Sequence, residues 1–115
     1  MKNDRAVSVL SALAQDNRLD VFRLLVQAGP QGMPAGRVAE ATGLAPNTLT
    51  FHFDRLRDAG LVTVRRDGRS MIYAALYETM NDLLAYLTEN CCQGEPCAPA
   101  AACKPARTKR TKVPA

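Results

Sequence analysis

A helical spacing of apolar residues that changes to strict alternation is the feature that most constrains this chain of 115 residues. Up to Gly60 the apolar side chains recur every three or four residues, which indicates amphipathic helices. Over residues 61–66 and 69–76 they alternate, as in strands. Asp67 and Gly68 between these two segments predict a hairpin turn, because glycine accepts a positive φ without steric cost. The sequence therefore predicts helices followed by a β-hairpin.

Start and stop residues divide the helical part into segments. We expect five helices. The first covers residues 4–15, and the second runs from a cap at Asp16 and Asn17 to the stop at Gly29. The other three cover residues 34–42, 46–59 and 77–90. Gly43 suits the left-handed residue after a helix, and Pro46 suits a first helical position, where its missing N–H is not needed. The second helix should bury a stripe of Leu19, Phe22, Leu25 and Val26, and the fourth should bury Leu49, Phe53 and Leu56.

Two helices joined by a tight turn that contains glycine make a helix-turn-helix, and the hairpin that follows is a wing. In such folds the second helix enters the major groove of DNA. The side chains expected on the solvent face of this helix are Asn47, Thr48, Thr50, Phe51, His52 and Arg55. The wing arginines expected to bind phosphates are Arg65, Arg66 and Arg69. Each of them alone is equally typical of an ordinary surface, and a histidine at this place is often a core or capping residue.

Residues 4–90 resemble the ArsR/SmtB family of metal- and metalloid-responsive repressors. The resemblance is carried by residues 17–25 (NRLDVFRLL), 38–44 (VAEATGL), 47–53 (NTLTFHF) and 56–62 (LRDAGLV), with Arg66 to Arg69 and Tyr73 in the wing. It implies a mainly α fold with a small β-hairpin, a dimeric winged helix-turn-helix. It also implies a homodimer, held through the first and last helices, that binds operator double-stranded DNA of two-fold symmetry. The residues expected at that dimer contact are Val7, Leu10, Tyr77, Met80, Leu84 and Leu87.

All four cysteines fall within thirteen residues near the C-terminus. Some arsenic-responsive members of the family have a similar Cys-Cys pair after the last helix. Trivalent arsenic and antimony prefer three sulfur ligands, and soft thiolates select soft ions. We therefore predict that Cys91, Cys92 and Cys97 bind As(III) or Sb(III) as an inducer, with Cys103 beyond Pro99 as a further candidate. The DNA-bound form needs no cofactor.

Other uses of these cysteines stay open. Four thiolates could hold zinc or another soft metal, and Cys92 with Cys97 could form a redox-switching disulfide. A small thiol reductase is the least favoured class, because no arginine follows Cys97 at the distance that a phosphate-type loop would need. The arsenite site at the start of the helix-turn-helix is not expected, because residues 33–38 contain no cysteine. A zinc site on the last helix is not expected either, because that helix has no histidine.

Charge supports a division into two parts. Residues 1–90 carry ten basic and ten acidic groups, whereas residues 91–115 hold five basic groups against Glu95 and so contain the whole net charge of +4. We predict a DNA-binding and dimerisation domain over 1–90 and a flexible, basic sensor tail over 91–115, which favours nucleic acid. No signal peptide or membrane span is evident, so a cytoplasmic protein without a membrane partner is expected.

Overall fold

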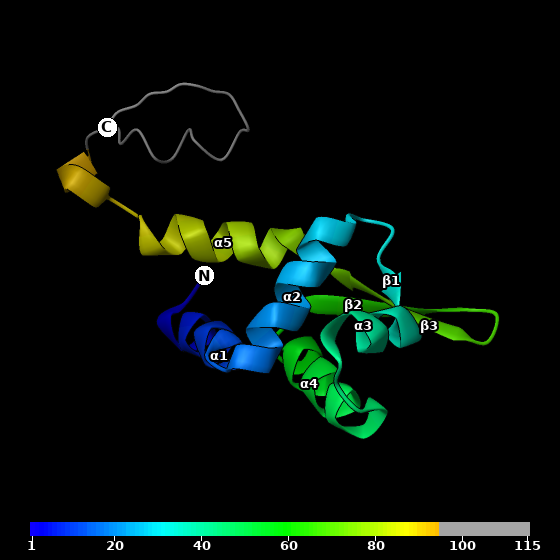
Figure 1. The fold of residues 1–115 in the computed structure, drawn as a ribbon. Coiled ribbons are helices and arrows are strands. Elements are labelled where there is room, and N and C mark those ends of the chain that lie inside the picture. Colours follow the sequence, from blue (N-terminus) through cyan, green and yellow to red (C-terminus); the bar gives the residue numbers. More distant parts are fainter. Residues whose placement is uncertain (95–115) are drawn as a thin grey trace, which may run out of the picture. The chain divides into compact units, whose positions relative to one another are not determined.

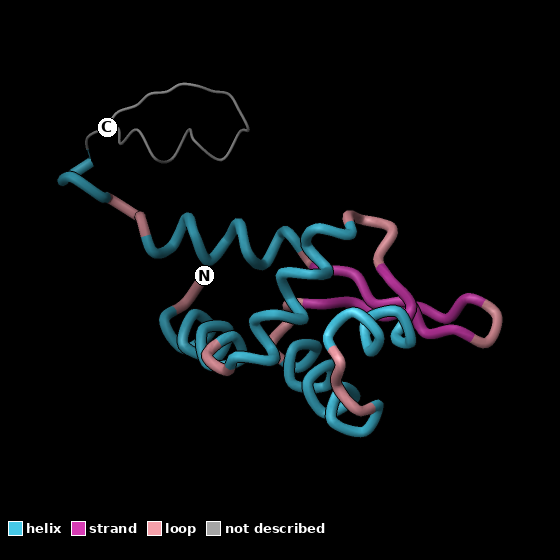
Figure 2. The backbone as a smooth tube through the Cα atoms, viewed as in Figure 1, coloured by secondary structure: helices cyan, strands magenta, loops and turns pink. Residues whose placement is uncertain are grey.

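The computed structural model describes residues 1–94, in which helices dominate and one small antiparallel sheet is present (Figures 1 and 2). The elements are α1 (Asn3–Leu13), α2 (Asp16–Ala28), β1 (Met33–Pro34), α3 (Ala35–Thr42), α4 (Pro46–Asp58), β2 (Val62–Asp67), β3 (Ser70–Ala75), α5 (Tyr77–Leu87) and the 3₁₀ helix η1 (Cys91–Gly94). The predicted mainly α fold with a small hairpin is confirmed. Residues 1–84 form one compact unit, and the chain from residue 85 onward is grouped apart from it. None of the described helices has the length and apolar character needed to cross a bilayer.

The ends of the central helices follow from local backbone chemistry. Gly43 ends α3 with φ 74° and ψ 10°, and its N–H donates to the carbonyl of Ala39 at 2.8 Å. Pro46 begins α4, as predicted. The prediction for α2 is wrong by one residue, because Gln15 is the extended N-cap and its Oε1 accepts from the N–H of Arg18 at 2.9 Å. A glutamine side chain can therefore satisfy the helix start that we expected Asp16 or Asn17 to cap.

The sheet has the strand order β1-β3-β2, and the two-residue strand β1 was not predicted. The hairpin pairs Asp67 with Ser70, so its loop is Gly68 and Arg69, one residue later than expected. Met33 pairs with Tyr73 across β1 and β3.

Gly32 allows β1 to approach β3 closely. Its φ is 78°, and a Cβ at this position would collide with the carbonyl oxygen of Tyr73. The approach of β1 to the wing therefore requires a residue without a side chain at this position.

The core lies between α2, α4 and the sheet. Leu49, Phe53 and Leu56 of α4 are buried, as predicted, and the Phe53 ring stacks on Tyr73 of β3 with centroids 3.6 Å apart and planes at 5°. The largest fully buried side chains of the described residues are Phe53, Leu25, Leu56, Leu61, Val9, Val21 and Val38.

The start of α5 is joined to the core through polar contacts. Thr79 Oγ1 donates to the carbonyl of Gly60 at 2.7 Å, and the N–H of Leu76 donates to the carbonyl of Leu61 at 2.8 Å. Thr79 and Leu83 are the buried residues of this helix. It ends at Leu87, three residues before the predicted end at Asn90.

The structure defines which faces of α1 and α2 are buried, and it corrects the prediction for α2 in part. In α1 the buried residues are Ala6, Val9 and Ala12. In α2 Val21 joins Phe22 and Leu25, whereas the predicted core residues Leu19 and Val26 are 42% and 38% exposed. The prediction for Leu19 and Val26 is therefore wrong, because α2 turns Val21 toward the interior.

His52 is buried and only 5% exposed, so the prediction that it lies on the solvent face of α4 is wrong. Within residues 1–94, its Nδ1 has no hydrogen-bond partner. Burial, and secondarily the nearby Arg18 guanidinium, lower the pKa of His52, since both disfavour the charged imidazolium. The buried position of the side chain therefore favours the neutral imidazole.

This burial makes stability depend on pH in a defined direction. Because the folded pKa of His52 is lowered, the unfolded chain binds a proton that the folded chain rejects, and stability is lost as pH falls below the unfolded value. We expect the free energy of unfolding in urea to be smaller at about pH 5.5 than at about pH 7.5, on either side of the unperturbed value. The variant His52→Gln should show a smaller difference. His52 is the only histidine in the sequence, so no other imidazole contributes to this difference. An equal pH dependence in both proteins would contradict the buried position of His52.

The close approach at Gly32 gives a second test of the fold. The variants Gly32→Ala and Gly43→Ala both place a side chain at a positive φ, but only the Cβ at position 32 meets a backbone atom, and the Cβ at position 43 meets open space. We expect Gly43→Ala to cost about 1–2 kcal/mol. We expect Gly32→Ala to cost about 1–3 kcal/mol more, measured by urea unfolding. Equal losses would show that β1 can move away from β3 freely.

Candidate nucleic-acid interface

The outer face of α4 is polar and open. Asn47, Thr48, Thr50, Phe51 and Arg55 are all exposed on it. Amide, hydroxyl and guanidinium groups can bind base edges and phosphates, and an aromatic ring can contact a thymine methyl group. The face therefore offers hydrogen-bonding and apolar contacts in one place.

Two of these side chains are oriented by contacts within α4. The guanidinium carbon of Arg55 lies 5.1 Å from the centroid of the Phe51 ring, a cation–π arrangement that holds the arginine over the ring. The Thr50 hydroxyl donates to the carbonyl of Pro46 at 3.0 Å, which leaves its oxygen as an acceptor. Of the six predicted α4 contacts, His52 alone points inward.

The first turn of α4 has free capacity for an anion. Its N-cap is Ala45, which has no side chain that could accept from the first N–H groups. Such uncapped N–H groups, together with the helix dipole, favour a phosphate. The turn between α3 and α4 thus presents backbone donors beside the side chains of Asn47 and Thr48.

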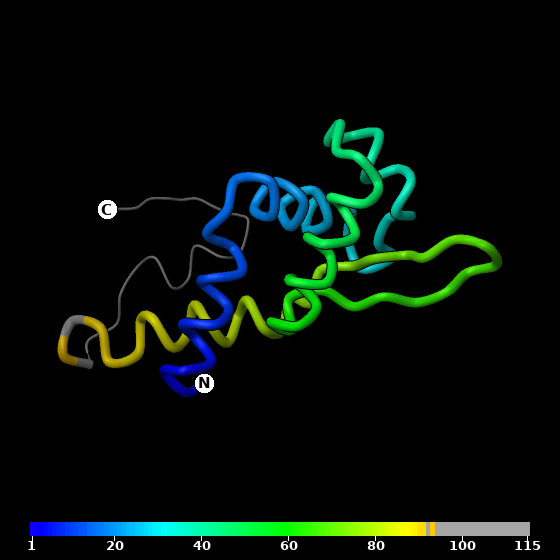
Figure 3. The backbone as a smooth tube through the Cα atoms, turned by 90° about the horizontal axis from the view of Figure 1, so that it is seen from below, coloured from blue at the N-terminus to red at the C-terminus, as the bar shows by residue number. Residues whose placement is uncertain are grey.

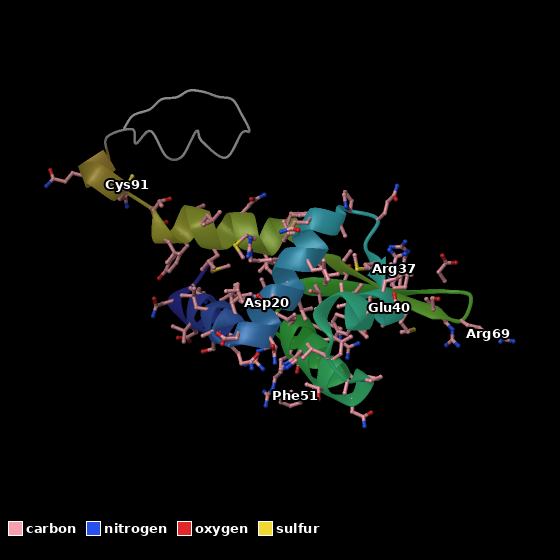
Figure 4. All side chains as sticks on the ribbon, in the orientation of Figure 1. Asp20, Arg37, Glu40, Phe51, Arg69 and Cys91 are labelled. Atoms are coloured by element: carbon pink, nitrogen blue, oxygen red, sulfur yellow. The ribbon has the colours of Figure 1, made fainter. Side chains whose placement is uncertain are left out.

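The three wing arginines are exposed, but their environments differ. Arg65 donates from Nη2 to the carbonyl of Gln31 at 3.0 Å, and Arg66 donates from Nε to the carbonyl of Gly68 at 3.3 Å. Arg69 stands at the tip of the hairpin (Figure 4). The bond to Gln31 ties the hairpin to the segment before β1, a contact that no local sequence signal predicts.

The wing adjoins the helix-turn-helix within the unit formed by residues 1–84, since β3 contacts α3 and β2 contacts α4. In Figures 1 and 3 the hairpin projects to the right, and in Figure 1 the turn between α3 and α4 lies at the bottom of the view. Phe51 and Arg69 lie on the outside of these two elements (Figure 4). The predicted contacts of α4 and of the wing therefore lie on two adjoining parts of the same unit.

Arg18 of α2 contacts α1 and lies near α4. Its Nε donates to the carbonyl of Ala12 at 2.7 Å, so it closes the C-terminal end of α1. Its charge also reaches His52 of α4. A contact between three helices depends on their packing and has no signature in local spacing.

The candidate cysteines are only partly within the described residues. Cys91 is a free, half-buried thiol at the start of η1. Cys92 follows it in the backbone of η1, and Cys97 and Cys103 lie outside the described residues. Within residues 1–94, no group of three or more His, Cys, Asp or Glu side chains is arranged to hold a metal ion.

The predicted dimer residues differ in exposure. Val7 and Leu10 of α1 are 54% and 43% exposed, opposite the buried face of that helix. Leu84 and Leu87 of α5 are also exposed, and Met80 is half-buried. Tyr77 is half-buried as well, and its hydroxyl donates to the carbonyl of Val26 at 3.0 Å, so its own domain holds this ring in place.

Comparison with known proteins places this geometry in a family. Residues 13–65 match the profile of a helix-turn-helix domain. The HTH-type transcriptional regulator YgaV of Escherichia coli is 30% identical over 89 residues, which cover 77% of this chain and 88% of YgaV.

Solved structures show the same fold. An ArsR-like transcriptional regulator from Rhodococcus sp. RHA1 superposes with a TM-score of 0.69 at 24% identity, over 88% of this chain and 91% of that one. A homodimeric winged helix-turn-helix DNA-binding domain from Mycobacterium bovis superposes with a TM-score of 0.62 at 24% identity, over 80% and 85%. The chain therefore belongs to the family of helix-turn-helix transcriptional regulators, and its winged fold is that of the ArsR type.

Proposed function

We propose that this protein is a transcriptional repressor that binds a two-fold symmetric operator as a homodimer and is released by trivalent arsenic or antimony. The observation that carries DNA binding is the exposed, polar face of α4, in a fold that also carries exposed arginines on the adjoining wing. Family membership supports DNA as the partner of this surface, since the relatives are transcriptional regulators. The paired recognition helices of a dimer would enter successive major grooves about one helical turn apart.

The exposed stripe of α1 supports the dimer. Val7 and Leu10 are larger than the buried Ala6 and Ala12 of the same helix, yet they face solvent in a single chain. A second copy that covers this stripe removes apolar surface from water, which favours association. The homodimer of the Mycobacterium bovis domain is consistent with this use of the fold.

The sensor is assigned to the cysteines by their chemistry. All four thiols of the chain lie between positions 91 and 103, and Cys91 comes four residues after the end of α5. Three thiolates from a short segment can form the pyramidal S₃ set that As(III) and Sb(III) prefer, and thiolate ligands select soft ions. Cys91, Cys92 and Cys97 are the proposed ligands, and Cys103 is a fourth candidate.

Release then follows from a difference in affinity between two shapes of the dimer. Closing a sulfur-ligated loop directly after α5 would change the end of a helix that is proposed to contact the partner copy. A ligand that favours this second shape weakens operator binding, and the operator weakens metalloid binding by the same factor. A coupling of about 1–3 kcal/mol would lower operator affinity roughly 5–150-fold.

The sensor proposal is tested by fluorescence anisotropy on a labelled duplex from upstream of the protein's own gene, with reduced protein. Arsenite should release the wild-type protein, and Cys91→Ser, Cys92→Ser and Cys97→Ser should each bind DNA normally but resist release. Cys103→Ser tests the fourth candidate. Release by zinc or an oxidant but not by arsenite would replace the arsenic assignment with a soft-metal or redox sensor of the same fold.

The dimer proposal has a matched pair of variants. Leu10 and Leu19 are 43% and 42% exposed, but only Leu10 lies in the proposed contact. Because burying an unpaired charge costs about 2 kcal/mol or more, Leu10→Glu should weaken the dimer about 30-fold or more. It should weaken operator binding with it, whereas Leu19→Glu should leave both unchanged. Sedimentation equilibrium measures the dimer, and equal behaviour of the two variants would place the contact elsewhere.

A further inference from the structure

A hollow of about 620 Å³ opens between α1, α2 and α4. Its walls carry polar and aromatic side chains from all three helices, namely Ser8, Ser11, Arg18, Phe51, Arg55 and Asp58. Two of these, Phe51 and Arg55, also belong to the outer face of α4 described above. The hollow therefore adjoins the candidate DNA surface.

Arg18 is held in place at the wall of this hollow. Its bond from Nε to the carbonyl of Ala12, at 2.7 Å, uses one of the five N–H donors of the guanidinium. The terminal NH₂ groups keep the planar fork that binds phosphate or carboxylate in two-point fashion. An arginine fixed in this way loses less conformational entropy when it binds an anion.

The second arginine and the local charge favour an anion in the same space. Arg55 is positioned over the Phe51 ring at 5.1 Å. Asp58 is the one acidic residue in the wall, so the two arginines leave an excess positive charge there. A third guanidinium, that of Arg5, rests against Gly60 next to the lining residue Ala59. The hydroxyls of Ser8 and Ser11 add neutral donors.

We propose that this hollow binds an oxyanion carried on an organic body, with Arg18 and Arg55 as its charged partners. The volume exceeds what a bare phosphate needs and lies in the range of about 300–1,000 Å³ typical of small-molecule sites. The Phe51 ring, which is 51% exposed, supplies an apolar surface for the body of the ligand. Two sources fit this chemistry: a sugar-phosphate of the operator backbone, or a free organic anion.

The operator backbone is the source that the placement favours, because three of the named wall residues belong to α4. In this form the inference rests on the proposed DNA-binding function and extends its surface from α4 and the wing to α1 and α2. Each protomer then gains a phosphate contact on the side of α4 that faces α1.

The test compares Arg18→Gln with Arg23→Gln in the full chain. Arg23 is on the same helix, has the same charge and is exposed, but it does not line the hollow. Operator affinity is measured by anisotropy at several salt concentrations. Loss of one phosphate contact per protomer should reduce the slope of log K against log salt by about 0.9 per protomer. Arg18→Gln should also weaken binding about tenfold or more at fixed salt, whereas Arg23→Gln should keep the wild-type slope.

A second variant guards against a folding defect, since Arg18 also closes α1. The double variant Ser8→Ala with Ser11→Ala removes two exposed hydroxyls and should weaken operator binding while leaving the helical circular dichroism unchanged. In a parallel arm, DNA-free protein is titrated with inorganic phosphate and with benzoate, and amide NMR shifts of residues 8, 11 and 51 are followed. Shifts that disappear in Arg18→Gln show that the hollow binds an oxyanion through this arginine in the absence of DNA.

The outcomes separate this inference from the proposed function. A reduced salt slope in Arg18→Gln, with an unchanged slope in Arg23→Gln, supports an operator phosphate. NMR shifts in a protein whose salt slope does not depend on Arg18 support a free oxyanion. Wild-type behaviour of both the Arg18→Gln and the double-serine variants, together with an absence of NMR shifts, overturns the inference even if the operator binds well. Failure of the wild-type protein to bind any duplex at low salt counts against the proposed function. The NMR titration then tests by itself whether the hollow binds an oxyanion.

Discussion

The stacked pair of Phe53 and Tyr73 is the contact on which the arrangement of this domain depends. It joins the middle of α4 to β3, with ring centroids 3.6 Å apart, and thereby fixes the recognition helix against the sheet that carries the wing. Tyr73 also pairs with Met33 of β1, where only a glycine at position 32 lets the backbones approach. One aromatic contact therefore sets the position of α4 relative to the hairpin, and side chains far apart in sequence can act on one ligand.

The division of α1 into two faces explains how the same helix can serve the core and an interface. Its small buried residues let it lie close to the rest of the domain, whereas Val7 and Leu10 stay outside. A single chain gains little from these larger side chains, because the hydrophobic stabilisation comes only when they leave water. The same packing opens the polar hollow beside α4, since Ser8 and Ser11 are exposed on this helix as well.

Charge and chemistry are distributed unequally along the chain. Residues 1–90 are electrically balanced, so their DNA surface depends on where a few arginines are placed and not on a general positive field. All four cysteines lie in the segment after α5. Under the proposed function, recognition and sensing thus use separate residues, and α5 connects them because it begins in the core at Thr79 and ends shortly before Cys91.

The sequence by itself determined the order of helices and hairpin, the turn at Gly43 and Pro46, and the buried side of α4, because these depend on local backbone preferences and on one clear apolar stripe. Only the tertiary structure decided which faces of α1 and α2 are buried, that His52 points inward, that Met33 and Pro34 form a strand, and that Arg18 reaches the end of α1. Helical spacing indicates that residues share a face, but it cannot say whether that face meets the same chain or solvent when apolar residues occur on both sides. A two-residue strand has no periodicity of its own and exists through pairing with β3, a contact between residues about forty positions apart.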